Sequence, residues 1–168
     1  PKYKCYDKAG MKVLVLGYTN ANIKGWLNES LWSGMDFKSL LPLVQEDVDK
    51  IVAKEKPHVV VVAVHSGTGK GDESVLESQG MDLYNSLKGV DFVICSHDHS
   101  ALTISNDHIA LLNSGSHARN LGYGSITLSV KDGELQSKEF ETKLIPVNPE
   151  KVDEQMRKDF HKDFEAVK

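Results

Sequence analysis

Three histidines follow two apolar runs in this chain of 168 residues. His65 comes directly after residues 59–64 (VVVVAV), and His97 and His99 come shortly after residues 92–95 (FVIC). Imidazole is the commonest metal-binding side chain in proteins. Histidines at positions i and i+2 project to one side of an extended segment, so both can reach one metal cluster. We therefore predict that His65, His97 and His99 are metal ligands.

The Gly-rich segment 66–72 (SGTGKGD) does not match a P-loop. The pattern G-x-x-x-x-G-K-[ST] needs its first glycine at the position that Val64 occupies. It also needs Ser or Thr after Lys70, where this chain has Gly71. We expect a flexible loop here rather than a nucleotide-binding loop.

Composition excludes several classes of function. Lys and Arg number 20 and Asp and Glu 24, which gives a net charge of −4. A mildly acidic chain without a basic stripe is a poor partner for nucleic acid polymers, although metal ions can still bring phosphate groups to it. The longest apolar run, residues 59–64, is far shorter than the roughly 20 residues of a membrane span. Cys5 and Cys95 fit no paired zinc or redox motif.

The elements that position the histidines are predicted to form a mixed α/β fold. Strands are predicted at residues 3–6, 11–17, 58–64, 91–95, 102–104, 108–112, 125–130 and 134–142, and helices at residues 38–54, 73–87 and 152–167. Apolar runs without polar alternation need cover on both faces, so the strands ending at Val64 and Cys95 should be central and parallel. Ligand sites of such sheets lie beyond the carboxyl ends of the strands, where the three histidines are expected.

Four segments, taken in chain order, resemble the motifs of one family. They are residues 10–19 (GMKVLVLGYT), 61–67 (VVAVHSG), 96–100 (SHDHS) and 113–122 (NSGSHARNLG). They are similar to the G-x-K-[IV]-[AG]-[VI]-[IL]-G-[LY]-T, V-V-x-[LV]-[ST]-H-x-G, G-G-H-[ST]-H-[TS] and Q-A-G-x-x-G-[RK]-x-[LV]-G segments of the bacterial 5′-nucleotidase, UDP-sugar hydrolase and 2′,3′-cyclic-nucleotide 2′-phosphodiesterase family. That family belongs to the calcineurin-like metallophosphoesterases.

The resemblance implies the C-terminal half of a metallophosphoesterase-like α/β/β/α sandwich with a mixed sheet. It implies two divalent metal ions of the Zn, Mn, Fe or Co class in the full-length enzyme, and one or none in this fragment. His65 and His97 would bind one ion and His99 the other. The family's first half is absent: there is no D-x-H or G-D on an early strand and no G-N-H-[DE], and the dipeptide Gly71-Asp72 comes after His65 and is out of order. The bridging Asp, the Asn and the catalytic His are therefore expected upstream of Pro1, and no catalytic residue is predicted within the chain.

The resemblance also divides the chain and implies a function. Residues 1–146 would be the C-terminal part of the catalytic domain, and residues 147–168 a charged linker helix toward a missing specificity domain. The implied activity is metal-dependent hydrolysis of phosphoesters of nucleotides or nucleotide sugars, in nucleotide catabolism. The family is mostly periplasmic, extracellular or on the cell surface. The fragment alone is expected to be inactive, with exposed apolar surface that the last helix or a second copy of the chain would cover.

Two other functions stay open from the residues. The chain can be a non-catalytic binding or scaffold domain with relic histidines, or a hydrolase with one metal held by the three histidines. The scaffold function would be excluded if the reading frame upstream of Pro1 encodes the D-x-H, G-D and G-N-H-[DE] motifs of the family. The metal content of the purified chain tests the three-histidine hydrolase.

Overall fold

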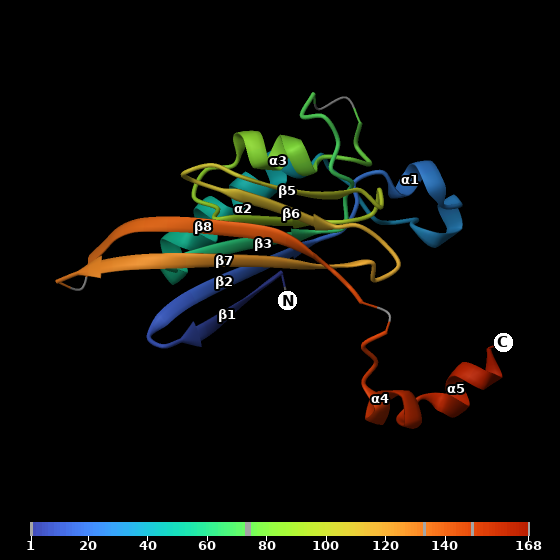
Figure 1. Ribbon diagram of the computed structural model, residues 1–168. Coiled ribbons are helices and arrows are strands. Elements are labelled where there is room, and N and C mark those ends of the chain that lie inside the picture. Colours follow the sequence, from blue (N-terminus) through green and yellow to red (C-terminus); the bar gives the residue numbers. More distant parts are fainter. Residues whose placement is uncertain (1, 73–74, 133, 149, 168) are drawn as a thin grey trace.

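A computed structural model describes residues 2–72, 75–132, 134–148 and 150–167. The strands are β1 (Tyr3–Lys8), β2 (Met11–Tyr18), β3 (Val59–Val64), β4 (Phe92–Cys95), β5 (Ala101–Ser105), β6 (Ala110–Ser114), β7 (Asn120–Lys131) and β8 (Glu134–Pro146) (Figure 1). The helices are α1 (Ile23–Trp26), α2 (Leu40–Glu55), α3 (Gly80–Ser86), α4 (Glu154–Asp159) and α5 (His161–Ala166), and Glu29–Leu31 form a 3₁₀ turn.

The first six strands form one mixed sheet in the order β1-β2-β3-β4-β6-β5, and β7 and β8 form a separate ribbon. Strand β3 pairs in parallel with β2 on one side and with β4 on the other. The β3–β4 register places Val64 opposite Cys95. The predicted mixed α/β fold is confirmed, and so are the central, parallel positions of the strands that end at these two residues.

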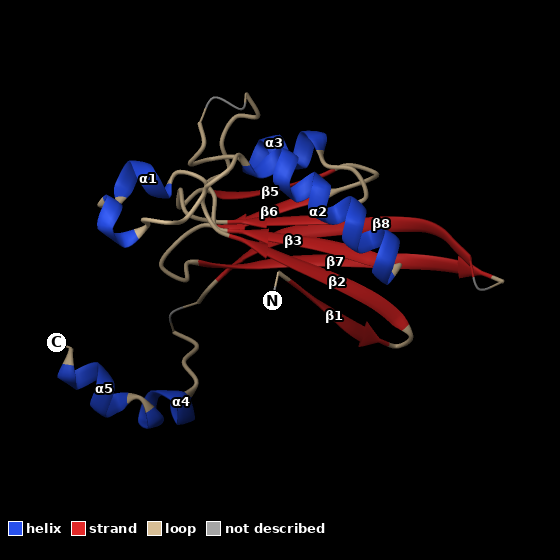
Figure 2. Cartoon of the chain, turned by 180° about the vertical axis from the view of Figure 1, so that it is seen from behind, coloured by secondary structure: helices blue, strands red, loops and turns tan. Residues whose placement is uncertain are grey.

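Helices α2 and α3 cover one face of the six-stranded sheet (Figure 2). The core on this side consists of fully or almost fully buried side chains: Leu14, Leu16, Val62 and Val93 from the strands, and Leu40, Val44, Val48 and Leu83 from the helices. The α2 members recur at four-residue intervals, which places them on one stripe of the helix. Burial of these side chains fixes α2 and α3 against the strands that lead to the histidines.

Gln79 joins helix α2 to the loop that precedes α3. Its side chain is fully buried; Oε1 accepts a hydrogen bond from the Leu40 amide at 3.0 Å, and Nε2 donates to Ser39 Oγ at 3.0 Å. The first amides of a helix have no acceptor within the helix, so Gln79 satisfies one of them. Helix α2 ends at Glu55. The next residue, Lys56, has a left-handed φ of 48°, and Pro57 follows it.

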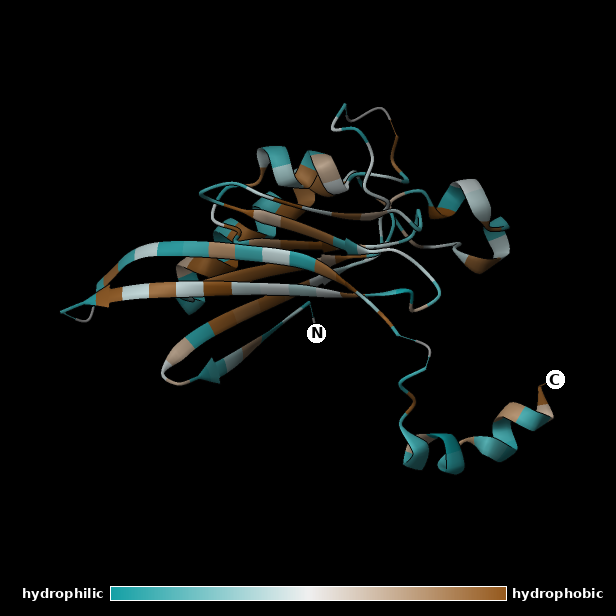
Figure 3. Cartoon of the chain, viewed as in Figure 1, coloured by the Kyte–Doolittle hydropathy of each residue, from teal (hydrophilic) through white to brown (hydrophobic). Residues whose placement is uncertain are grey.

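The β7–β8 ribbon lies on the opposite face, over β4 and β6, and two glycines permit its close approach. A Cβ at Gly122 would lie 2.5 Å from Leu112 Cδ2, and one at Gly124 would lie 2.8 Å from Phe92 Cε1. The Phe140 ring of β8 contacts the Phe92 ring at a centroid distance of 5.7 Å. In Figure 3 the central strands are hydrophobic, whereas β7 alternates, as expected for a ribbon with one face in water.

The same face of the sheet is less covered over β2 and β3. Val13, Val15, Val61 and Ala63 are half-buried there, and Ile94 of β4 is 41% exposed. Apolar surface is therefore open on this face, and α4 and α5 lie away from it (Figure 1).

The helix predicted at residues 73–87 is wrong in its first half. Helix α3 begins at Gly80, and residues 73–74 lie outside the described residues. The Gly80 amide donates to the Gly67 carbonyl at 2.9 Å, so the backbone here bonds to the Gly-rich loop instead of continuing a helix. A Cβ at Gly80 would lie 3.0 Å from Cys95 Sγ, so this glycine serves close packing.

The single helix predicted at residues 152–167 is in fact two short helices, α4 and α5, which meet at Phe160. They lie away from the sheet (Figure 1), and Met156, Phe160 and Phe164 of the apolar stripe are 60%, 57% and 59% exposed. Isolated helices shorter than about 12–15 residues are marginal in water, so a stripe that stays largely exposed does not enforce one straight helix. None of the described helices is both long and apolar enough to cross a membrane.

We expect Leu83→Ala to destabilise the chain by about 2–5 kcal/mol, because the side chain is fully buried between α3 and the sheet. Leu31→Ala is the matched control; its side chain is 63% exposed, and the change should stay within about 0.5 kcal/mol. Urea unfolding followed by circular dichroism measures both. Equal losses in the two variants would contradict this assignment of the core.

Candidate metal centre

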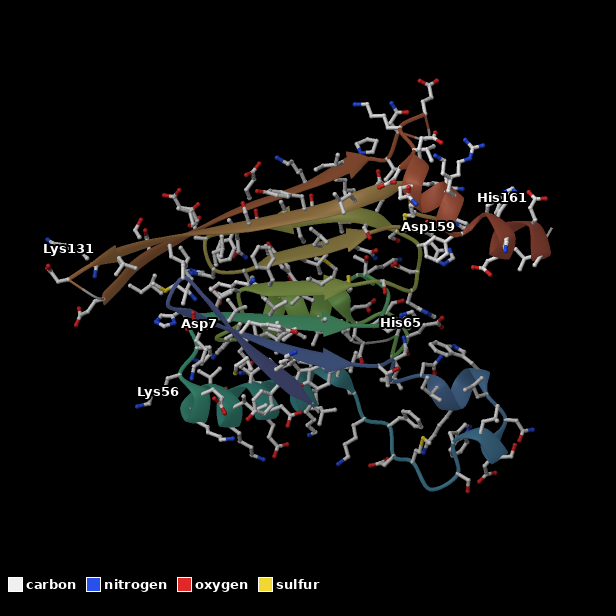
Figure 4. The ribbon with its side chains drawn as sticks, turned by 90° about the horizontal axis from the view of Figure 1, so that it is seen from below. Asp7, Lys56, His65, Lys131, Asp159 and His161 are labelled. Atoms are coloured by element: carbon white, nitrogen blue, oxygen red, sulfur yellow. The ribbon has the colours of Figure 1, made fainter. Side chains whose placement is uncertain are left out.

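His65 and His97 meet at the edge of the sheet where the parallel strands end. Figure 4 shows His65 there, at the opposite end of the sheet from Lys131. His65 Nε2 lies 3.1 Å from His97 Nδ1, and the two rings are 4.9 Å apart at an angle of 72°. Two nitrogen ligands of one tetrahedral metal, each about 2.0–2.1 Å from it, lie roughly 3.3 Å apart. The facing nitrogens therefore have the separation of two ligands of a common ion.

The hydrogen-bond partners of the two rings fix the tautomer of His97 and allow either tautomer of His65. His97 Nε2 lies 2.7 Å from Glu77 Oε1, and a carboxylate can only accept, so Nε2 carries the hydrogen. His65 Nδ1 lies 3.3 Å from the Ser96 hydroxyl, which can either donate to this nitrogen or accept its hydrogen. When Ser96 donates, His65 carries its hydrogen on Nε2 and donates it to His97 Nδ1 at 3.1 Å. When Ser96 accepts, the lone pairs of His65 Nε2 and His97 Nδ1 face each other, and a cation between them would relieve their repulsion.

The loop that carries His97 and His99 has an uncommon backbone conformation. His97 has φ 110° and His99 has φ 58°, values that residues other than glycine rarely adopt. Backbone strain of this kind persists only where the surrounding structure enforces it, and it concentrates at functional sites.

Asp98 lies between these two residues and holds the loop. Its Oδ2 accepts from the Thr68 amide at 2.6 Å, and its Oδ1 accepts from Asn113 Nδ2 at 2.9 Å and from the Ser100 amide at 3.2 Å. Burial raises the pKa of Asp98, but the hydrogen bonds from these three residues more than offset it, so the pKa lies below its ordinary value.

Asn20 and Ser66 fix the backbone beneath the site. Asn20 Nδ2 donates to the His65 carbonyl at 3.1 Å and to the Glu77 carbonyl at 2.9 Å, and Ser66 Oγ donates to the same Glu77 carbonyl at 3.1 Å. Asn20 and Ser66 are almost completely buried, and so is Thr68. The prediction of a flexible Gly-rich loop is therefore wrong for its first part, which is bonded into the core.

His99 has a different neighbour from the other two predicted ligands. Its ring meets that of His117 edge to face at 5.7 Å, and His117 Nδ1 lies 2.8 Å from Ser116 Oγ. Within the described part of the chain, no three His, Cys, Asp or Glu side chains are grouped so that they could hold a metal ion. The structure therefore brings His65 and His97 together, and it gives His99 a contact with His117.

Glu77 and Trp26 are site residues that sequence reasoning missed. The Trp26 ring stacks on His97 at 4.8 Å and 23°. The hydrogen bond from His97 is the main cause that lowers the pKa of the Glu77 carboxyl; hydrogen bonds with the Trp26 and Asn22 side chains add to it, and burial opposes it. Both residues lie in irregular segments or a single short turn, where no periodic pattern marks a residue.

We expect Asp98→Asn to cost about 1 kcal/mol at pH 7, less than the roughly 1.5–3 kcal/mol of a hydrogen bond to a charged group, because Asp98 is exposed to solvent. Its pKa is lower in the folded than in the unfolded chain. The stabilisation is thus present above the unfolded value of about 3.9 and is lost as pH falls through the folded value.

The difference between wild type and Asp98→Asn should therefore shrink as the pH falls below about 4. Urea unfolding at pH 7, 5, 4 and 3 measures it. Asp107→Asn, at an exposed position between β5 and β6, is the control. A difference that grows on acidification would refute the role of the ionised carboxylate.

No family model matches this chain, and no curated protein matches its sequence. Solved structures do match. A Staphylococcus aureus protein described as a 5′-nucleotidase, in complex with alpha-ketoglutarate, has a TM-score of 0.74 at 20% identity over 98% of this chain and 33% of its own. Sulfate thiohydrolase SoxB of Thermus thermophilus has a TM-score of 0.73 at 20% identity over 97% of this chain and 28% of its own.

The calcineurin-like phosphoesterase YfkN of Bacillus subtilis has a TM-score of 0.80 at 18% identity, over 98% of this chain and 57% of its own. The chain thus spans between about a quarter and just over half of the proteins it matches. At these identities the likeness concerns the fold. The predicted fold is confirmed in these terms: the chain has the mixed α/β fold, with a mixed six-stranded sheet, of the C-terminal part of calcineurin-like phosphoesterase domains.

Proposed function

We propose that this chain contributes histidine ligands to the two-metal centre of a phosphoester hydrolase that acts on nucleotides. The observation that carries the proposal is the convergence of His65 Nε2 and His97 Nδ1 at 3.1 Å beyond the carboxyl ends of two parallel strands, with His97 on strained backbone. The fold shared with a calcineurin-like phosphoesterase and with a protein described as a 5′-nucleotidase supports the reaction class.

The donor set fits a transition metal. Neutral imidazoles suit Zn, Mn, Fe or Co, and carboxylates commonly complete the coordination sphere. The outer nitrogens of His65 and His97 have hydrogen-bonding partners in Ser96 and Glu77, which is the usual arrangement around metal-binding histidines. In the proposal these two residues hold one ion, and His99 contributes to the second.

Two bound ions would polarise the phosphoryl oxygens and lower the pKa of a bound water. Residues of this chain would bind the ions and orient the ligands. His65 and His97 supply lone pairs, and Trp26 covers one face of the His97 ring against water. Asp98 and Asn20 hold the two loops in register. The carboxylates that bridge the ions are proposed to come from chain outside residues 1–168.

The division of the chain is part of the proposal. Residues 1–146 form the C-terminal part of the catalytic domain, which is supported by the end of the β8 ribbon at Pro146. Residues 147–168 form the linker toward a nucleotide-specificity domain, which is supported by the position of α4 and α5 away from the sheet (Figure 1). A one-metal site of three histidines has less support, because the contact given for His99 is with His117.

We expect the purified chain to bind Zn²⁺ or Co²⁺ weakly. His65→Ala and His97→Ala should each lower the affinity at least 10–100-fold, since loss of even an outer partner of a ligand costs about that much. His161→Ala, on α5 and apart from His65 in Figure 4, should leave it unchanged. Isothermal titration calorimetry measures all four proteins. Equal affinities for wild type and both site variants would exclude the ligand assignment.

The isolated chain should show no phosphatase turnover of nucleoside monophosphates with added Mn²⁺ or Zn²⁺, whereas the product of the complete reading frame should be active. The physical reason is that two metals need a bridging carboxylate, which the proposal places outside this chain. In the complete protein, His97→Ala should reduce kcat/KM at least 10–100-fold.

A sulfate ester serves as the competing substrate, because one structural neighbour is a sulfate thiohydrolase. Robust phosphatase turnover by the fragment alone would overturn the half-site proposal. Preference of the complete protein for the sulfate ester would overturn the substrate class.

A further inference from the structure

Glu77 contacts His97 on the side of the ring away from His65. Its Oε1 lies 2.7 Å from His97 Nε2, whereas His97 Nδ1 faces His65. The Glu77 side chain is 40% exposed and that of His97 is 22% exposed, so the contact is at the margin of the site rather than in the core. Glu77 lies in the loop between β3 and α3, which the fold brings to the same edge as the end of β4.

Hydrogen bonds hold the Glu77 backbone in place, although the Glu77 side chain is partly exposed. Its carbonyl accepts hydrogen bonds from Asn20 Nδ2 at 2.9 Å, from the Gly67 amide at 3.0 Å and from Ser66 Oγ at 3.1 Å. Both Asn20 and Ser66 are buried. The carboxylate is therefore presented to His97 from a fixed point.

The Glu77 carboxylate and the His97 ring share another neighbour. The Trp26 ring stacks on the His97 ring at 4.8 Å and 23°, and the Trp26 side chain also contributes to the lowered pKa of the Glu77 carboxyl. Stacking fixes the plane of the imidazole, and the Glu77 contact fixes its rotation within that plane. Together they leave Nδ1 pointing at His65 Nε2.

We infer that Glu77 is the positioning residue of this centre: its carboxylate accepts the Nε2 hydrogen of His97 and so keeps the Nδ1 lone pair free and aimed at His65. Without this partner, neutral His97 can carry its hydrogen on either nitrogen. In the other tautomer the hydrogen on Nδ1 occupies the place of the metal. The inference rests on the proposed function for its metal readout, but its tautomer readout is independent of any metal.

The experiment compares wild type with Glu77→Ala, Glu77→Gln and Glu46→Ala. Glutamine can accept the same hydrogen through Oε1, so it should rescue part of the effect. Glu46 is an exposed α2 carboxylate bonded to Lys50 and serves as the matched control. The midpoint of urea unfolding shows whether each variant folds. If Glu77→Ala does not fold, the His97 tautomer is compared between wild type and Glu77→Gln.

Two quantities are measured on the chain of residues 1–168. Nitrogen-15 NMR of the metal-free imidazoles gives the tautomer of His97, and competition of Co²⁺ or Zn²⁺ with a chromophoric chelator gives the affinity. We expect His97 to carry its hydrogen on Nε2 in wild type and to populate both tautomers in Glu77→Ala. We expect the affinity to fall 10–100-fold in Glu77→Ala, less in Glu77→Gln and not at all in Glu46→Ala.

The outcomes separate this inference from the proposed function. If His65→Ala and His97→Ala bind metal as tightly as wild type but Glu77→Ala shifts the tautomer, the proposed function fails and the positioning role stands. If His65→Ala weakens binding and Glu77→Ala changes neither affinity nor tautomer, the inference is overturned and the proposed function stands. Weaker binding with an unchanged tautomer also overturns it, since the carboxylate would then act through its charge alone.

Discussion

The site depends on the parallel pairing of β3 with β4. Their register sets Val64 beside Cys95, and beyond it the Ser96 amide donates to the Ser66 carbonyl at 3.1 Å. This pairing makes the chain segments after both strands leave the sheet at one edge, so His65 and His97 meet although they are 32 positions apart in the sequence. Helices α2 and α3 cover one face of this pair, whereas on the other face the ribbon packs on Phe92 of β4 and leaves Val61 and Ile94 partly exposed.

The sequence predicts that His65 and His97 lie at one edge of the sheet, but it does not predict the contacts that orient their side chains. Unbroken apolar runs before His65 and His97 predict two central strands, and strand ends in an α/β sheet predict a shared edge. Glu77 could not be found in this way, because its position results from carbonyl bonds to Asn20 and Ser66 that follow no period. Asp98 carried a signal, since serine or threonine is commoner at that position of the family motif. Its bonds to Thr68 and Asn113 are nonetheless long-range, and no local pattern predicts them.

Both wrong helix predictions have a common physical origin. Residues 73–87 are predicted as one helix, but α3 begins at Gly80, whose amide is hydrogen-bonded to the Gly67 carbonyl and which packs closely against Cys95. Residues 152–167 are predicted as one helix, but the side chains of Met156, Phe160 and Phe164 are largely exposed, and periodicity predicts a continuous helix only where the apolar stripe packs on the core. In both places tertiary contact decides the outcome, and a window of neighbouring residues does not contain that contact.

The long β7–β8 ribbon separates two ends of the molecule that can be altered independently. Lys131, at the end of β7, lies at the opposite end of the sheet from His65 (Figure 4). Gly122 and Gly124 let the other part of the ribbon pack closely on β6 and β4. Exposed loop tips tolerate insertion far better than packed strands do. The molecule therefore offers a natural attachment point for a fluorophore, a surface tether or a grafted domain. A cargo placed there would be held a full strand length away from the histidines and would leave their edge of the sheet accessible.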